Sequence, residues 1–167
     1  TVENRIPALL AGTIDLECGS TTNTLARQEQ VDFSLTTFLT GGSLLALAQA
    51  PVGADLRSIR IAVIPGTTTE QVLKAAVTQS GAAVQFIAVP DHAEGLAALE
   101  RQTADAYASD RIILIGLALA APNPARFALA DQYFSYEPYA LMLRRGDPAF
   151  RLAVNRALAR LYRSGQI

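Results

Sequence analysis

A run of small polar residues follows a short strand-like segment near the start of the chain. The sequence GSTTNT (residues 19–24) precedes an expected helix that carries Arg27. Backbone amides and hydroxyl groups at a helix start attract an anion, and a guanidinium group can pair with a carboxylate through two hydrogen bonds. Ser20, Thr22 and Arg27 are therefore candidates for holding a carboxylate. Alternatively, Thr22 or Thr24 only caps the helix and Arg27 lies in water.

The stretch PGTTTE (residues 65–70) repeats this chemistry after a second strand-like segment. Gly66 allows a close turn, and Thr67 and Glu70 are spaced as a capping box with Thr67 as the N-cap. Gly66, Thr67 and Thr68 are thus candidates for a second set of anion-binding groups, although a well-capped helix in any α/β protein would look the same. The stretch lacks the lysine of a P-loop, which disfavours nucleoside triphosphate binding.

Two further candidates lie where strand-like segments end. Asp110 could receive an ammonium group, because ligands of open α/β sheets gather at the carboxyl ends of the strands. Alternatively, Asp110 is the N-cap of a helix that begins at Arg111. His92, the only histidine, could donate a hydrogen bond to a ligand's side chain. A lone histidine at a helix start is more often an exposed or capping residue.

Composition narrows the class of protein. The 167 residues carry 14 basic and 15 acidic side chains, so the chain has no basic footprint for nucleic acid. No apolar run approaches the roughly 20 residues that span a bilayer, and the most apolar stretch, residues 112–121, is expected to be a buried helix. The single cysteine, Cys18, excludes an internal disulfide. The sequence predicts neither a cofactor nor a metal ion.

Strand-like and helix-like segments alternate along the chain, which predicts an α/β fold with mostly parallel strands. The last helix is amphipathic, since Phe150, Val154, Leu158 and Leu161 recur at helical spacing. The expected helices are residues 2–10, 22–30, 68–80, 93–101, 111–120 and 148–164. The expected strands are residues 13–17, 43–49, 60–64, 83–89, 104–109, 126–130 and 139–144.

Two extended segments have the character of connections between lobes. Residues 40–53 place glycines on both sides of an apolar run, and residues 133–147 form a long stretch before the last helix. A chain that leaves one lobe at residues 39–47 and returns at residues 135–141 would form two lobes joined by a double hinge.

Four stretches together resemble the polar amino-acid family of periplasmic solute-binding proteins, which serve ATP-binding-cassette (ABC) importers. They are residues 4–34, 61–73, 92–110 and 144–167, in the family's order and spacing. ECGSTTN and the Asp-His pair at 91–92 are most similar to glutamate- and aspartate-binding members. The resemblance implies the type II fold, in which two α/β lobes close on an amino acid. Ser20, Thr22 and Arg27 match first-lobe positions that hold the ligand's α-carboxylate.

The resemblance also implies roles for the candidates of the second lobe. Thr67 and Thr68, after Gly66, match groups that contact the ligand from the side opposite to the first lobe. Asp110 matches the carboxylate that takes the α-ammonium group. His92 resembles a position that contacts the side-chain carboxylate of an acidic ligand.

The family pattern begins with a stretch of first lobe that has no counterpart here, so an incomplete first lobe is expected. Residues 1–46 and 134–167 would form the partial first lobe, and residues 47–133 the second lobe. Cys18 resembles a cysteine that is paired in some relatives, but the matching region has no second cysteine, which implies a free, buried thiol. An incomplete first lobe could also associate with a second copy of the chain.

The functional expectation is periplasmic or other extracytoplasmic binding of a polar, acidic L-amino acid, followed by delivery to the permease subunits of an ABC importer. A ligand-sensing domain of a receptor or signalling protein with the same fold is the alternative. An enzyme would need Cys18, His92 and Asp110 as nucleophile, base and orienting group. The position of Cys18 within a strand-like run disfavours that reading.

Overall fold

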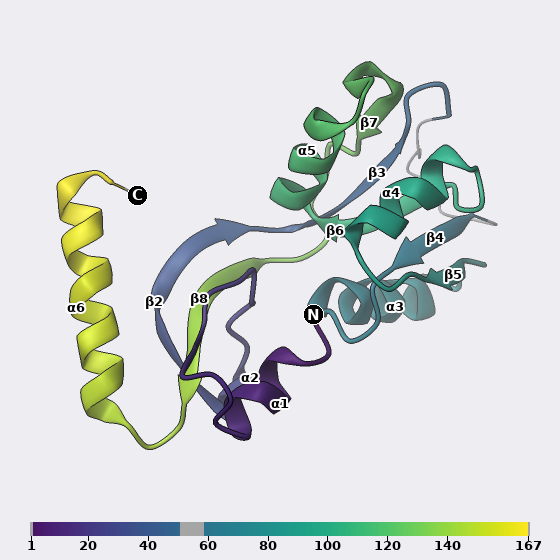
Figure 1. Cartoon of the computed structure of the whole chain (residues 1–167). Helices are drawn as coiled ribbons and strands as arrows, with labels where there is room; N and C mark the ends of the chain where they lie inside the picture. Colours follow the sequence, from purple (N-terminus) through teal and green to yellow (C-terminus); the bar gives the residue numbers. More distant parts are fainter. Residues whose placement is uncertain (1, 51–58, 167) are drawn as a thin grey trace. The chain divides into compact units, whose positions relative to one another are not determined.

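The computed structural model describes residues 2–50 and 59–166. The chain divides into two units. Unit 1 is formed by Thr1–Leu39 together with Glu137–Ile167, and unit 2 is formed by Thr40–Tyr136. The chain therefore passes twice between the units, as Figure 1 shows along the sequence colours.

Unit 1 contains a three-stranded sheet with the strand order β1-β8-β2. Its strands are β1 (Leu16–Glu17), β2 (Val31–Thr40) and β8 (Glu137–Arg144), and its helices are α1 (Arg5–Leu10), α2 (Leu25–Gln28) and α6 (Pro148–Ser164). β1 pairs with β8 in the antiparallel sense. The core of unit 1 is a cluster of Leu9, Val31, Phe33, Ala140 and Met142.

Helix α6 has the bounds that the sequence predicts and lies beside strand β2. The side-chain oxygen of Asn155 accepts a hydrogen bond of 2.8 Å from the Leu35 amide. The Tyr162 hydroxyl donates one of 2.5 Å to the Thr36 carbonyl. Of the apolar face of α6, only Leu158 is fully buried, so polar contacts to the β2 backbone contribute to holding this amphipathic helix.

Unit 2 contains a five-stranded sheet with the order β5-β4-β6-β3-β7. Its strands are β3 (Gly42–Leu47), β4 (Arg60–Val63), β5 (Gln85–Ala88), β6 (Ala106–Asp110) and β7 (Phe127–Leu129). Its helices are α3 (Thr68–Ser80), α4 (His92–Glu100), α5 (Arg111–Ala120) and the 3₁₀-helix η1 (Pro124–Arg126). The connection from β4 to β5 contains α3, and the connection from β5 back past β4 to β6 contains α4, which places the two helices on opposite faces of the sheet (Figure 1).

The prediction of mostly parallel strands is wrong. In unit 2, β4 runs parallel to β5 and β6, but β3 is antiparallel to both β6 and β7. The alternation of strand-like and helix-like segments in the sequence indicated only the parallel strands β4, β5 and β6. The antiparallel pairing of β3 was missed, because its partners β6 and β7 are distant from it in sequence. The core on the α3 face is formed by Leu44, Ile61, Val63, Leu73, Ala106 and Ala108.

The borders between the units differ from those expected at residues 46/47 and 133/134. All of β3 belongs to unit 2, since it pairs with β6 and β7 there. The Phe134 amide also donates a hydrogen bond of 2.9 Å to the Gly42 carbonyl within unit 2. The first connection therefore lies between Leu39 and Thr40, and the second between Tyr136 and Glu137.

Two expectations about burial are corrected. The apolar helix α5 is largely uncovered within its unit, with Ile112 at 42% exposure and Leu119 at 69%, and Leu114 is its buried residue. The free thiol of Cys18 is exposed rather than buried. β1 ends at Glu17, so Cys18 already lies in the polar loop that follows it.

Candidate functional site

Asp110 ends strand β6, and its side chain lies against the first turn of helix α3. Alternation along β6 puts Asp110 on the same face as Ala106 and Ala108, which pack in the α3-side core. The Thr69 hydroxyl donates a hydrogen bond of 2.9 Å to Asp110 Oδ1, and both side chains are buried. Asp110 occupies the N-cap position of α5 but makes no side-chain capping bond there. Its carboxylate therefore lies on the face of the sheet that α3 covers, where it contacts Thr69.

Helix α3 begins as the sequence predicts. Thr67 is the N-cap, and its hydroxyl accepts a hydrogen bond of 3.1 Å from the Glu70 amide and donates one of 2.8 Å to the Ile64 carbonyl. The Glu70 carboxylate accepts a hydrogen bond of 2.8 Å from the Gly66 amide. Gly66 has a φ of +75°, a backbone conformation that favours glycine. Ligand contacts by Gly66, Thr67 and Thr68 remain predictions.

Thr69 is a residue that sequence reasoning missed. It is the third of three consecutive threonines, and only its two predecessors were singled out. The signal that could have found it is helical geometry. With Thr67 as the cap, Thr69 lies in the first turn, and it is the threonine of this run that is fully buried against the sheet.

His92 is the first residue of helix α4, and its Nδ1 lies 2.7 Å from the Tyr107 hydroxyl. The N-cap of α4 is Asp91, whose carboxylate accepts a hydrogen bond of 2.8 Å from the Glu94 amide. His92 is therefore neither the cap nor a fully exposed residue. Burial lowers the pKa of His92, and the negative charges of Asp110 and Asp91 oppose this shift.

The three candidates of unit 1 surround one turn. The Thr22 hydroxyl is buried and donates a hydrogen bond of 2.5 Å to Glu137 Oε2. Arg27 is half-buried, and its Nη1 donates a hydrogen bond of 2.8 Å to the Thr22 carbonyl. Thr24 is the N-cap of α2 and accepts a hydrogen bond of 3.2 Å from the Arg27 amide. The side chain of Ser20 is exposed.

Sequence reasoning also missed the polar groups that support this turn. Arg5 donates a hydrogen bond of 2.8 Å to the Thr21 hydroxyl, which in turn donates one of 2.8 Å to Glu17 Oε2. Glu137, the partner of Thr22, is only 1% exposed. No local sequence pattern marks Glu137, because its contact with Thr22 joins residues more than 100 positions apart.

The structure distributes the candidates over both units. Unit 1 holds Ser20, Thr22 and Arg27, and unit 2 holds Gly66, Thr67, Thr68, His92 and Asp110. Within unit 2, the hydrogen bond between Thr69 and Asp110 joins the helix start at Thr67 to the end of β6. The candidates of unit 2 therefore follow the carboxyl ends of the parallel strands β4, β5 and β6, the edge at which open α/β sheets bind ligands.

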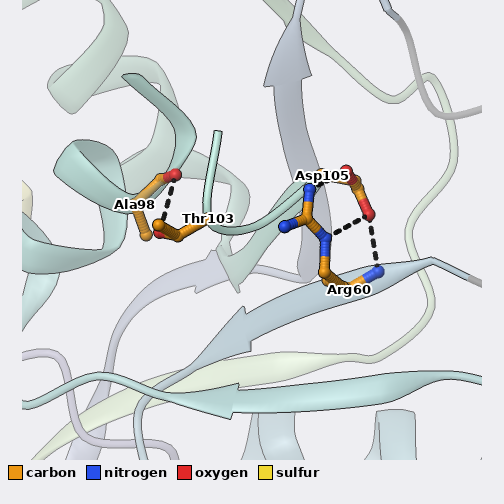
Figure 2. Close-up of polar contacts among 4 residues, drawn as sticks. All are labelled: Arg60, Ala98, Thr103 and Asp105. Atoms are coloured by element: carbon orange, nitrogen blue, oxygen red, sulfur yellow. Dashed lines mark hydrogen bonds and ion pairs between the residues drawn. The ribbon is translucent and has the colours of Figure 1, made fainter. Parts of the chain in front are cut away.

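A cavity of about 200 Å³ lies at the opposite ends of these strands. Figure 2 shows the ion pair there, in which Arg60 donates two side-chain hydrogen bonds of 2.7 and 3.1 Å to the Asp105 carboxylate. The Arg60 guanidinium lowers the pKa of Asp105. Thr103 closes the nearby turn through a hydrogen bond of 3.2 Å to the Ala98 carbonyl. The two charges compensate each other, and no candidate residue lines this cavity.

Within residues 2–50 and 59–166, no group of three or more His, Cys, Asp or Glu side chains is placed to hold a metal ion. The helices of this same part of the chain are too short or too polar to cross a bilayer. The residues considered for an enzyme fall in different units, since Cys18 belongs to unit 1 and His92 and Asp110 belong to unit 2.

The family of bacterial extracellular solute-binding proteins, family 3, matches residues 1–167. This chain belongs to that family. It is 37% identical, over its whole length, to the L-glutamate/L-aspartate-binding protein of Pseudomonas aeruginosa. It is 34% identical, over 99% of its length, to the glutamate/aspartate import solute-binding protein of Escherichia coli. The chain spans 56% of the length of each of these two relatives.

Solved structures share the fold of this family 3 chain. An ancestral arginine-binding protein bound to glutamine is 26% identical with a TM-score of 0.84, and the match covers 98% of this chain and 72% of that one. The GluR0 ligand-binding core of Nostoc punctiforme, in complex with L-glutamate, is 23% identical with a TM-score of 0.83, and the match covers 99% and 74%. These matches confirm the type II periplasmic-binding-protein fold with a partial first lobe.

Proposed function

We propose that this protein binds an acidic L-amino acid outside the cytoplasm, in the periplasm, and delivers it to the permease subunits of an ABC importer. The observation that carries the proposal is the 37% identity, over the whole chain, to a protein named for binding L-glutamate and L-aspartate. The Salmonella typhimurium relative, 35% identical, is likewise named a glutamate/aspartate import solute-binding protein.

The charges of the candidate residues suit the two ends of an amino acid. Asp110 supplies a buried carboxylate for the α-ammonium group, and Thr69 fixes the direction of that carboxylate. Arg27, with Ser20 and Thr22, supplies a guanidinium group and polar atoms for the α-carboxylate. Removal of one partner of a desolvated ion pair lowers affinity, because it leaves the other charge buried and unpaired.

The remaining candidates, Thr67, Thr68 and His92, are proposed to contact the anionic groups of the ligand. Thr67 and Thr68 follow Gly66 at the start of α3, where backbone amides and the helix dipole favour an anionic group. His92 would contact the side-chain carboxylate, since it lies at the start of α4 with one ring nitrogen already engaged by Tyr107.

The proposed mechanism is closure of the two lobes around the ligand. A ligand that contacts groups on both units shifts the population toward the closed form by its difference in affinity for the two forms. The two connections at residues 39–40 and 136–137 are where hinge rotation would be absorbed.

A thermal-shift panel of the twenty amino acids tests this function. A ligand that binds only the native state raises the melting temperature with its concentration. We expect a rise with L-glutamate or L-aspartate and none with L-lysine, and D-glutamate is the control for stereochemical recognition. A rise with L-lysine, or no rise with either acidic amino acid, would contradict the proposal.

Self-association through the partial first lobe is a further part of this proposal. Large apolar side chains of β2 are exposed in unit 1, with Leu35 at 45%, Phe38 at 47% and Leu39 at 57%. Sedimentation velocity over a range of concentrations tests it. A monomer at every concentration would contradict self-association and leave the binding proposal in place.

A further inference from the structure

Tyr107 is a fully buried residue of β6 that lies beneath helix α4. It shares a face of the sheet with Ser109, opposite to the face of Asp110. A methyl group on Gly95 would lie 2.5 Å from the Tyr107 ring, so α4 packs directly on that ring because residue 95 has no side chain. His92 lies one turn before Gly95, and this brings its imidazole to the phenol oxygen.

The two rings meet in a defined geometry. Nδ1 of His92 lies 2.7 Å from the Tyr107 hydroxyl oxygen, and the rings are inclined by 66° with their centres 6.3 Å apart. A neutral imidazole has one nitrogen that donates and one that accepts a hydrogen bond. The hydrogen bond that Nδ1 makes therefore determines whether Nε2 is a donor or an acceptor toward a ligand.

The surroundings of the phenol decide the direction of this hydrogen bond. Burial raises the pKa of Tyr107, so the phenol keeps its proton. A buried phenol proton without an acceptor costs free energy, and among the described residues the acceptor within hydrogen-bond distance of the phenol is Nδ1 of His92. The single proton of the Tyr107 phenol is thus directed to Nδ1 of His92.

We propose that Tyr107 is a positioning residue that holds His92 in its Nε2–H form, so that the imidazole presents a donor to the side-chain carboxylate of an acidic amino acid. The identity of the ligand rests on the proposed function, whereas the tautomer is a property of unit 2 alone. Tyr107 acts through His92. The charged groups around the imidazole are Asp91 and Asp110, and burial favours its neutral form against both of them.

The tautomer can be measured directly, because His92 is the only histidine. In protein labelled with ¹⁵N-histidine, long-range proton–nitrogen spectra at neutral to slightly alkaline pH report which ring nitrogen carries the proton. We expect Nε2–H in the wild type and in the control Tyr136→Phe, whose side chain is 69% exposed. Tyr107→Phe keeps the ring beneath Gly95, removes the donor and should give a mixture of tautomers.

Ser109→Ala is a second control, at a residue on the same face of β6 as Tyr107. It keeps the phenol proton donor and should leave His92 in its Nε2–H form, as in the wild type. A dominant Nδ1–H form in the wild type would overturn the proposal. An unchanged tautomer in Tyr107→Phe would overturn it as well.

Titration with L-glutamate separates this inference from the proposed function. Tyr107→Phe should weaken L-glutamate binding about three- to tenfold, as expected for one misdirected hydrogen bond, and Tyr136→Phe should not. Equal affinity in wild type and Tyr107→Phe, with an altered tautomer, would overturn the role in specificity. If the wild type does not bind L-glutamate, the proposed function fails while the spectra still decide the positioning claim.

Discussion

The Thr69 hydroxyl lies 2.9 Å from Oδ1 of Asp110 and joins the first turn of α3 to the end of β6. Both side chains are buried, with exposures of 3% and 7%. A hydrogen bond from a neutral donor stabilises a buried carboxylate without cancelling its charge. The hydrogen bond therefore fixes the Asp110 carboxylate at the carboxyl end of the strand, where the proposed ligand places its ammonium group.

Thr69→Val should destabilise unit 2, because it keeps the shape of the side chain and removes the donor to a buried carboxylate. We expect a loss of about 1–3 kcal/mol in the free energy of unfolding. Urea unfolding followed by circular dichroism measures it. Thr78→Val is the matched control on the exposed side of α3 and should stay within about 0.5 kcal/mol of wild type. Similar losses in both variants would show that the Asp110 contact is not the cause.

Two glycines within helices predict opposite effects of the same substitution. Gly95→Ala places a methyl group 2.5 Å from the Tyr107 ring and should destabilise the protein by about 1–3 kcal/mol through overpacking. Gly116→Ala in α5 meets no atom within 4 Å and should stabilise it by about 0.5–1 kcal/mol, because alanine favours a helix. Thermal and urea unfolding check both signs. Stabilisation by Gly95→Ala would contradict the packing of α4 on Tyr107.

His92 predicts a pH dependence of stability. Burial lowers its pKa in the folded protein below the ordinary value of 6.5, while Asp110 and Asp91 oppose the shift. Between the two pKa values the unfolded state binds more protons, so the free energy of unfolding should rise with pH in that window. It should fall as the pH drops below 6.5 and through the folded pKa. Urea unfolding across this range measures the slope, and His92→Gln should reduce it. An unchanged slope in His92→Gln would assign the effect to other groups.

Three helices could be predicted from the sequence with their bounds, since their signals are local. α3, α5 and α6 begin and end where the sequence places them. For α3 the signal is the threonine cap with Glu70 three positions later. For α6 it is a proline in the first turn and Gly165 after the last, in the left-handed conformation. α2 is shorter than the expected helix at both ends, and of the two threonines considered as caps Thr24 is its N-cap.

Elements that depend on distant partners could not be predicted. Strand β2 lacks a strict alternation of apolar and polar residues, since Val31 and Phe33 are buried while Leu35 and Phe38 are exposed. Its pairing comes from the C-terminal part of the chain. The same limit applies to the site: Asp110 and His92 have local signals, but Thr69 and Tyr107 gain their roles only when the sheet brings α3 and α4 to β6.

The most direct test of the central claim is titration calorimetry of L-glutamate with Asp110→Asn. Asparagine keeps the size of the side chain and removes the charge that the account assigns to the ligand's ammonium group. We predict a loss of about 2–5 kcal/mol in binding free energy, which is roughly thirtyfold or more in affinity. The control Asp131→Asn, at an exposed position of unit 2, should bind as the wild type does. Unchanged affinity in Asp110→Asn would contradict the account.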